Sequence, residues 1–487
     1  MILVMITTFY TSRIILETLG VEDYGIYNIV GGIVISFSIV SSALSGAISR
    51  FITFELGKSP NGNVKKVFTT SLFIQIGISI IIFFLGEFIG IYFLNTHINI
   101  PEIRLSAANF IFHTSLLTLV IRLIYVPFEA LIISHEKMSA YAIFGLVEVF
   151  LQLLVVFLIK IISFDKLETY GFMLMCITFT LLTMNIIFCI SNFKDALGMP
   201  HYNKTTFSQM LSFASWNFIG TSAGIFKQNG VDIIVNIFSG VTINAARGIA
   251  LQVNTAITKF NQSLITAIQP QIIKSYATND YNRYFFLVQQ GARFSFYLIL
   301  FLSLPVILEV DQILSFWLKL VPPSASDFVT LQLINALIIS LSQTLITAIL
   351  ATGRIRNYQL TVGILAMLNL PLSYLFLKLG YPIYITYIIS IIIECCCLGL
   401  RLYYFKTLSS LPITPFLKNV IANVFCVSCC AIICPLLLIY NMEESVTRFF
   451  LVVGVSILTT SASIYGIGLN NSEKQLIKQQ IKEKMNI

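Results

Sequence analysis

Residues 67–94 read VFTTSLFIQIGISIIIFFLGEFIGIYFL and contain a single charged side chain, Glu87. An α-helix rises about 1.5 Å per residue, so about 20 apolar residues cross the hydrocarbon core of a bilayer. Comparable runs recur along the whole chain and predict about fourteen membrane-spanning helices. The predicted spans are 1–19, 24–49, 67–94, 105–134, 140–162, 169–191, 207–238, 244–270, 285–309, 328–352, 358–378, 382–404, 416–440 and 447–468.

The composition excludes a water-soluble protein. Of the 487 residues, 57% are hydrophobic and 11% are charged, whereas soluble domains contain roughly 45–50% apolar and about 25% charged residues. No hydrophilic stretch is long enough for a separate globular domain. We therefore expect an all-α, polytopic membrane protein. Only twelve residues precede Arg13, so the first helix either begins with little cytoplasmic lead or starts upstream of Met1, and we favour the second.

The distribution of Lys and Arg predicts the orientation of the chain. One set of loops and helix ends holds eighteen Lys and Arg residues, and the alternate set holds six. The richer side is cytoplasmic by the positive-inside rule. Both termini are then expected in the cytoplasm, and the basic excess needs no nucleic-acid partner. The tail after Asn470 is too polar to span a membrane, so we expect a helix at the cytoplasmic surface.

The chain resembles itself at an offset of about 220 residues. A long span ending near Arg50 and a second one ending near Gln271 are each followed by a polar basic loop and another span. This spacing predicts two six-helix lobes, as in duplicated transporters. The predicted domains are an N-lobe at 1–191, a C-lobe at 207–404, two additional helices within 416–468 and a cytoplasmic tail at 469–487.

Ionisable side chains inside the spans are the candidate functional residues. Each costs about 2.5–3.5 kcal/mol on insertion scales, so each needs water, a partner or a ligand. For Lys227 and Lys259, we favour a water-filled cavity or an anionic ligand, since Lys259 has no acidic residue within one helical turn. Snorkelling toward the membrane surface and pairing with a carboxylate of another helix are the alternatives. Snorkelling is favoured for Arg13, Arg247 and Arg293.

Motifs of enzymes and metal sites are missing from the sequence. It contains neither a Walker A loop nor an H-E-x-x-H motif. The nine cysteines lie in apolar runs without polar ligands nearby, and we expect them to be small buried hydrophobic residues. The predicted external loops are short, which disfavours a membrane enzyme. We expect no catalytic residue, no metal site and no cofactor.

Three segments resemble a known family. TSRIILETLGVEDYGIYNIVGG (11–32), FSGVTINAARGIALQVNTAITKFNQSLITAIQPQI (238–272) and LATGRIRNYQL (350–360) are similar to Wzx-type O-antigen and polysaccharide flippases. These bacterial proteins belong to the multidrug/oligosaccharidyl-lipid/polysaccharide (MOP) exporter superfamily. The resemblance covers nearly the whole chain and implies a fold like that of the superfamily's multidrug and toxic compound extrusion (MATE) proteins. At its N-terminus the chain departs from the family, whose members have a fuller first helix.

The resemblance also implies a function. Such proteins move a polyprenyl-diphosphate-linked oligosaccharide from the cytoplasmic to the outer leaflet of the bacterial inner membrane. This step belongs to polysaccharide and lipopolysaccharide biosynthesis. The polysaccharide polymerase machinery is an expected partner. A basic central cavity holds the diphosphate. By their depth in the membrane, the cavity cations of this chain would be Arg13, Arg50, Arg122, Lys227, Arg247, Lys259 and Arg293. If transport needs a proton or sodium gradient, Glu129, Glu148 and Asp232 are the candidate coupling residues.

Other functions remain open at this point. A multidrug antiporter of the same superfamily would exchange organic cations for protons or sodium, but it needs carboxylates in a cavity with few cations. A membrane polymerase or ligase acting on lipid-linked sugars is disfavoured by the short loops. A channel or scaffold lacks support, since no ring of pore-lining residues is apparent.

Overall fold

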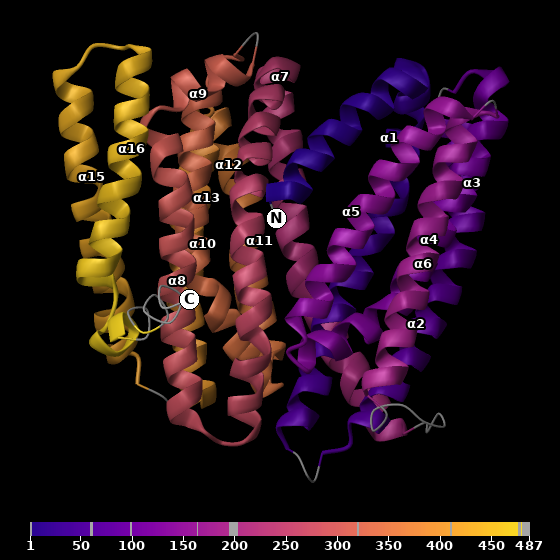
Figure 1. The fold of residues 1–487 in the computed structure, drawn as a ribbon, viewed down its shortest axis with the longest axis horizontal. Coiled ribbons are helices and arrows are strands. Elements are labelled where there is room, and N and C mark those ends of the chain that lie inside the picture. The colour runs from indigo at the N-terminus through magenta and orange to yellow at the C-terminus, as the bar shows by residue number, and fades with distance from the viewer. Residues whose placement is uncertain are drawn as a thin grey trace. The chain divides into compact units, whose positions relative to one another are not determined.

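The computed structural model describes residues 2–58, 62–97, 100–162, 164–193, 203–318, 321–409, 412–475 and 479. Within these ranges the regular structure is entirely helical, without strands (Figure 1). The helices are α1 (Ile2–Gly57), α2 (Val64–Leu85), η1 (Gly86–Gly90), α3 (Ile91–His97), η2 (Glu102–Arg104), α4 (Leu105–Ser134), α5 (Met138–Ile161), α6 (Lys166–Asn192), α7 (Lys204–Ala277), α8 (Tyr281–Leu308), α9 (Val310–Trp317), α10 (Ala325–Thr352), α11 (Arg356–Met367), α12 (Asn369–Lys378), α13 (Ile385–Ser409), α14 (Thr414–Phe416), η3 (Leu417–Ala422), α15 (Asn423–Asn441), α16 (Val446–Ser463) and η4 (Ile464–Gly468).

Ten helical segments in the described part of the chain are long and apolar enough to cross a membrane. The two longest helices, α1 and α7, account for the other four predicted spans. In α1 the helix is broken at Gly20, whose φ of 82° and ψ of 169° are non-helical and are readily adopted only by glycine. The break separates the first two predicted spans, so the predicted all-α, polytopic fold with about fourteen spans is confirmed.

Helix α7 doubles back on itself. A straight helix of its 74 residues would be about 110 Å long. Yet both of its ends contact the same end of α1: the Phe213 ring lies 5.6 Å from the Arg50 guanidinium, and a Cβ atom on Gly57 would lie 2.8 Å from Ala277. The chain therefore turns within α7, as the two spans predicted at 207–238 and 244–270 require.

The chain divides into two compact units. Unit 1 comprises Met1–Ser222 and Ile273–Asn279, and unit 2 comprises Ala223–Ile272 and Asp280–Ile487. Both ends of α7 thus belong to unit 1 and its middle part to unit 2. Each unit has its own apolar core.

In unit 1 the buried helix α4 packs against α1, α2 and α6. Its apolar face, with the fully buried Ile111, Phe112 and Leu116, forms the centre of a core cluster. One end of the unit is closed by an ion network in which Arg104, beside the start of α4, contacts Asp23 of α1 and Asp165, the N-cap of α6. The network joins three elements that are far apart in the sequence.

In unit 2, α10 has the corresponding central place and packs against α8 and α13. The span predicted at 358–378 is broken between α11 and α12 at Leu368. Pro371 explains the break, since proline lacks an N–H and its ring clashes with the carbonyl four residues earlier. The α15–α16 hairpin is attached to the rest of the unit by the buried pair Arg448–Glu309, with 3.2 Å between Nη2 and Oε2.

The helix termini repeat at the offset predicted from the sequence. Asn63 caps α2 by accepting from the N–H of Lys66, and Asp280 caps α8 by accepting from the N–H of Arg283. Three residues connect α4 to α5, and three connect α10 to α11. Each of these turns contains a left-handed residue, Glu136 with φ 58° or Gly353 with φ 77°. The duplication therefore extends to local turn geometry.

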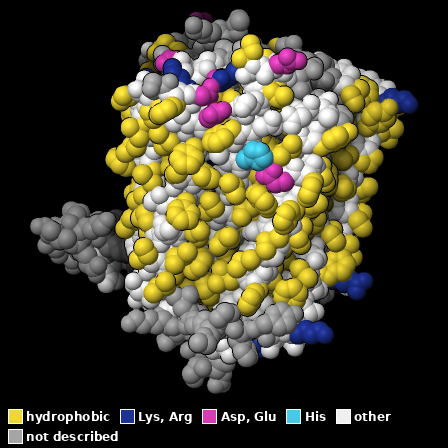
Figure 2. Space-filling view, turned by 90° about the vertical axis from the view of Figure 1, so that its right-hand side faces the viewer, with side chains coloured by type: hydrophobic (Ala, Val, Ile, Leu, Met, Phe, Trp, Pro, Cys, Tyr) yellow, Lys and Arg dark blue, Asp and Glu magenta, His cyan; other side chains and the backbone are white. Residues whose placement is uncertain are grey.

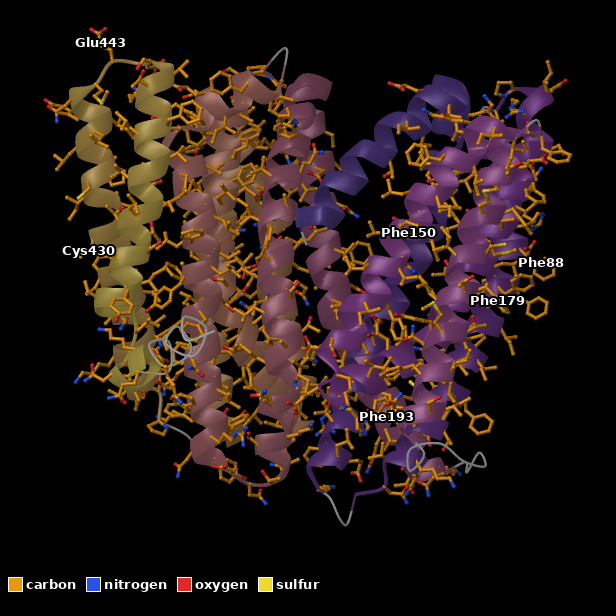
Figure 3. The ribbon with its side chains drawn as sticks, viewed as in Figure 1. Phe88, Phe150, Phe179, Phe193, Cys430 and Glu443 are labelled. Atoms are coloured by element: carbon orange, nitrogen blue, oxygen red, sulfur yellow. The ribbon has the colours of Figure 1, made fainter. Side chains whose placement is uncertain are left out.

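The outer surface of unit 1 is apolar over a broad band. Figure 2 shows hydrophobic side chains over most of this face, with charged ones mainly toward its edges. Phe88 and Phe179 point outward from their helices (Figure 3) and are 76% and 56% exposed. Such a face suits the hydrocarbon of a lipid bilayer. The chain is a multi-pass membrane protein.

The expectation that the cysteines are buried is wrong for most of them. Seven of the nine are exposed, and only Cys189 and Cys397 are buried. Cys430 lies on α15, in the hairpin that includes α16 (Figure 3). A helix surface that contacts lipid tails can be as apolar as a protein core, so hydropathy alone does not distinguish the two locations.

Candidate functional site

A cavity of about 260 Å³ lies inside unit 2. It is bounded by the outward and return legs of α7, by α10 and by α13. Charged and amide side chains supply much of its wall. Its lining residues are Gly224, Lys227, Gln228, Val231 and Asp232; Arg247, Leu251 and Asn254; Gln332, Asn335 and Ile339; and Tyr387, Ser390 and Glu394.

The lining positions follow helical periodicity. On the outward leg of α7 they recur at 224, 227, 228 and 231, and on its return leg at 247, 251 and 254. On α10 and α13 they recur at intervals of three and four residues as well. Such intervals place side chains on one face of a helix. Four helices thus each direct one partly polar face into the same space.

A charge triad stands at one side of the cavity, with Lys227 and Glu394 in the wall and the buried Arg401 behind it. The Lys227 ammonium on α7 lies 2.9 Å from Oε1 of Glu394 on α13. The other carboxylate oxygen, Oε2, lies 3.3 Å from Nη1 of Arg401, two helical turns further along α13. The same Nη1 donates a hydrogen bond of 2.9 Å to Oγ of Ser342 on α10. One carboxylate therefore stands between two cations.

A second ion pair completes the charged wall. The Arg247 Nε atom lies 2.6 Å from Oδ1 of Asp232, which joins the two legs of α7. The Arg247 guanidinium also lies over the ring of Tyr387, 5.1 Å from its centroid. Carboxylate and aromatic face together hold the guanidinium in one orientation.

Two amide oxygens of the wall have no hydrogen-bond partner. They are Oδ1 of Asn254 and Oδ1 of Asn335, both buried. A buried acceptor without a partner is unfavourable by about 1–3 kcal/mol. Both residues line the cavity, and an amide side chain can exchange hydrogen bonds with a ligand that carries hydroxyl or N–H groups.

The structure brings three of the ten residues predicted for the site into this cavity: Lys227, Arg247 and Asp232. For the two cations, pairing with a carboxylate, one of the alternatives considered for the sequence, is what the geometry shows. Both cations also line the cavity, so cavity lining and pairing with a carboxylate apply to them at the same time. Lys259 is exposed on α7 and does not line this cavity.

Three other predicted residues gather in unit 1. The Arg122 Nη2 atom on α4 lies 2.9 Å from Oε1 of Glu148 on α5. Glu129, two turns from Arg122 on α4, is close enough for its charge to interact with both of them and with Tyr125. The two candidate coupling carboxylates of this unit therefore share one neighbourhood.

The remaining predicted cations lie elsewhere. Arg50 is buried at the end of α1, with its guanidinium over the rings of Phe51 and Phe54 at 4.7 and 4.6 Å. Arg293 on α8 is 3% exposed, and its Nη2 lies 2.7 Å from Oε1 of Glu473. The side chain of Arg13 lies outside the described part of the structure.

Arg293 also contacts the beginning of the C-terminal tail. The beginning of the tail is anchored in unit 2, and most of the residues of the predicted surface helix lie outside the described part of the structure. Glu473 is buried, and Arg293 also donates to the backbone carbonyl of Gly468 at 3.1 Å. Snorkelling, favoured for Arg293 from the sequence, does not describe this buried pair.

Sequence reasoning missed Glu394 and Arg401 as site residues. A usable signal was present, since Ser390, Glu394 and Arg401 recur at intervals of four and seven on one face of a single span. The partner of Glu394 was not predictable in this way, because Lys227 is 167 residues distant.

The described residues contain no group of three His, Cys, Asp or Glu side chains that could hold a metal ion. The polar groups of the cavity are cations, carboxylates, amides and hydroxyls. Together these groups can bind a polar or charged organic group through hydrogen bonds and charge.

No protein-family model and no curated protein matches the chain. Solved structures do. An outward-facing multidrug resistance MATE family transporter of the MOP superfamily superimposes with a TM-score of 0.71 at 11% identity, covering 84% of this chain and 94% of that one. The chain has a MATE-like fold. The MATE-like architecture implied by the resemblance of the three sequence segments is thereby confirmed.

Two further MATE-like neighbours extend the comparison. The MATE transporter ClbM in complex with Rb⁺ gives a TM-score of 0.67 at 14% identity, covering 82% of this chain and 91% of that one. A MOP superfamily transporter from Pyrococcus furiosus, described as having a binding pocket of reverse polarity, gives 0.69 at 10% identity, with coverages of 84% and 93%. These neighbours are transporters. At identities this low, the likeness establishes the fold of this chain and not its function.

Proposed function

We propose that this chain is a flippase that moves a polyprenyl-diphosphate-linked oligosaccharide, an O-antigen or other surface polysaccharide unit, from the cytoplasmic to the outer leaflet by alternating access. It would act in the bacterial inner membrane with both termini in the cytoplasm, beside a polysaccharide polymerase machinery. The MATE-like fold and the three family-like segments support this proposal. The lobes would be those predicted at 1–191 and 207–404.

The charge balance in unit 2 carries the proposal. The cations Lys227, Arg247 and Arg401 are associated with only two carboxylates, Glu394 and Asp232. Together these groups carry one net positive charge beside a polar cavity inside a membrane protein, although the cavity wall itself holds two cations and two carboxylates. Buried net charge is unfavourable unless a partner neutralises it. A diphosphate is such a partner, and the acceptor oxygens of Asn254 and Asn335 suit the hydroxyl groups of an attached sugar.

The membrane potential favours the proposed direction. Moving one elementary charge through 100 mV is worth about 2.3 kcal/mol. A diphosphate with about two negative charges moves outward downhill from a negative interior, by roughly 4–5 kcal/mol at this potential. Flipping then needs no strong ion coupling. Glu129, Glu148 and Asp232 would serve as coupling residues only if a proton or sodium gradient proved necessary.

A cation-coupled multidrug antiporter is the second candidate. Asp232 and Glu394 both line the cavity, and carboxylates there suit a cationic cargo or a coupling ion. Both carboxylates are already bound to cations of the chain itself, however, which leaves them little capacity for a cationic ligand. The flippase is the better fit for this reason.

Genetic complementation tests the proposed function. A strain lacking its own oligosaccharide flippase should regain surface polysaccharide when it expresses this chain. We expect Lys227→Ala to abolish the gain and Lys227→Arg to retain part of it, at equal amounts of protein in the membrane. Lys259→Ala tests whether a cation outside this cavity also binds cargo. No restoration by the wild-type chain, together with drug resistance that depends on Asp232, would favour the antiporter instead.

A further inference from the structure

Glu394 has two cationic partners that differ in their access to the cavity. Lys227 and Glu394 both line the cavity, but Arg401 is not part of its wall. Arg401 is buried behind the carboxylate, where Ser342 accepts a hydrogen bond from its Nη1 at 2.9 Å. A ligand entering the cavity thus meets the ammonium of Lys227 and the carboxylate of Glu394, while the guanidinium of Arg401 is out of reach.

The carboxylate occupies the position on Lys227 that an anionic ligand would need. Oε1 of Glu394 lies 2.9 Å from the Lys227 Nζ atom, a distance typical of a charge-assisted hydrogen bond. An ammonium has three donors, but its single charge is largely neutralised by one carboxylate at this distance. An incoming phosphate must therefore compete with Glu394.

Arg401 keeps the displaced carboxylate paired. Removing one partner of a buried ion pair is strongly unfavourable, because the other charge stays buried without compensation. Glu394 can avoid this penalty, because its second oxygen, Oε2, already lies 3.3 Å from Arg401. Asp232, the other carboxylate of the wall, contacts Arg247 alone among the described cations. Of the two carboxylates in the wall, Glu394 is therefore the one that can exchange one cationic partner for another.

We propose that Glu394 is a resident competitor for the anionic cargo. It neutralises Lys227 in the empty cavity, transfers to Arg401 when a phosphate group binds, and returns to Lys227 to displace the phosphate. Arg401 is then a positioning residue that acts through Glu394. This inference rests on the proposed anionic cargo. Its consequence is a cavity whose affinity is held low enough for release on the far side of the membrane.

Binding of inorganic pyrophosphate to the purified full-length protein in lipid nanodiscs, measured by isothermal titration calorimetry without divalent metals, tests the proposal. Glu394→Gln should bind about tenfold more tightly than the wild type, which corresponds to about 1.4 kcal/mol. Arg401→Gln should bind several-fold more weakly, because Glu394 then keeps Lys227 as its only partner. A merely structural role would weaken binding in both variants.

Three controls complete the experiment. Glu394→Asp retains the competitor and should bind within about threefold of the wild type. Glu443→Gln, at the exposed connection between α15 and α16 (Figure 3), makes the same change in net charge far from the cavity lining and should leave binding unchanged. In a Lys227→Ala background, Glu394→Gln should no longer tighten binding.

The outcomes separate the two proposals. If Lys227→Ala abolishes binding while Glu394→Gln fails to tighten it, the resident competitor is refuted and the anion site stands. If the wild type and Lys227→Ala bind pyrophosphate alike, the anion site itself is refuted, and the competitor with it. Should Glu394→Gln not fold, the sign of the Arg401→Gln effect decides, since binding as tight as that of the wild type or tighter overturns the proposal.

Discussion

The two units place different chemistry at equivalent positions. In unit 1, Tyr27 and Tyr170 form an edge-to-face aromatic pair with their centroids 5.1 Å apart. About 220 residues later, Arg247 and Tyr387 form a cation–π pair at the same distance. An aromatic contact within the core of one unit thus corresponds to a charged contact at the cavity of the other.

The difference continues along the neighbouring helices. Beyond Glu168, α6 has no charged residue, and its Ile177 and Leu181 pack in an apolar cluster with α1 and α5. Its counterpart α13 contains Glu394 and Arg401 in the corresponding stretch. This stretch of unit 1 thus packs without charged side chains. We infer that the charges of unit 2 serve cargo binding and contribute little to folding.

Removing one charge of the triad has the largest expected effect on stability. Glu394→Met leaves Lys227 and Arg401 buried without their carboxylate, which destabilises the protein by about 3–5 kcal/mol. Thermal unfolding in detergent measures the loss. Adding Lys227→Met and Arg401→Leu should restore or exceed the original stability, since replacing a complete buried ion group by apolar residues is often neutral or stabilising by about 1–4 kcal/mol. A triple variant as unstable as the single one would contradict the comparison.

Arg247 and Tyr27 should respond differently to conservative substitution. Arg247→Lys keeps the charge but loses the planar group that contacts both Asp232 and Tyr387. We expect transport to fall by about tenfold, the equivalent of about 1.4 kcal/mol. Tyr27→Phe keeps the ring contact in unit 1 and should change transport less than about twofold. Flipping rates in proteoliposomes measure both, and equal losses would show that the units do not differ in function.

The smallest expected effect is on stability and concerns the ion network of Arg104, Asp23 and Asp165 in unit 1. Unit 2 lacks this network, since the residue 220 positions after Arg104 is the uncharged Ser324. Burial raises the pKa of Asp165, but hydrogen bonds from Arg104 and from the N–H groups of Glu168 and Leu167 outweigh it, so the pKa lies below its ordinary value of 3.8. A lowered pKa stabilises the folded protein above the unfolded-state value, and this stability is lost as the pH falls through the folded-state value.

Asp165→Asn should therefore lower stability at neutral pH by about 1 kcal/mol, because the pair is partly exposed. The difference from the wild type should shrink in acid, at and below the ordinary pKa of the carboxyl group. Unfolding measured from neutral pH to about pH 3 tests the sign. A difference that grew on acidification would contradict the assigned network.

Sequence reasoning predicted the fold better than the site. Span positions depend on local hydropathy, so even the two spans within α7 were found. Pairings such as Lys227 with Glu394, and Arg293 with Glu473, join residues more than 160 positions apart and depend on how helices pack. Depth in the membrane identifies the cations as candidates. It does not distinguish Arg293, which pairs with Glu473 of the tail, from Arg247, which lines the cavity.

If the charges of unit 2 bind an anionic cargo, the Lys227→Met/Glu394→Met/Arg401→Leu variant should keep its fold and lose transport. The measurement is the transfer of a fluorescent polyprenyl-diphosphate-linked sugar across proteoliposome membranes by the wild type and this variant, both first shown to melt at comparable temperatures. We predict transfer by the wild type and none above protein-free vesicles by the variant. Equal transfer by the two proteins would contradict the claim.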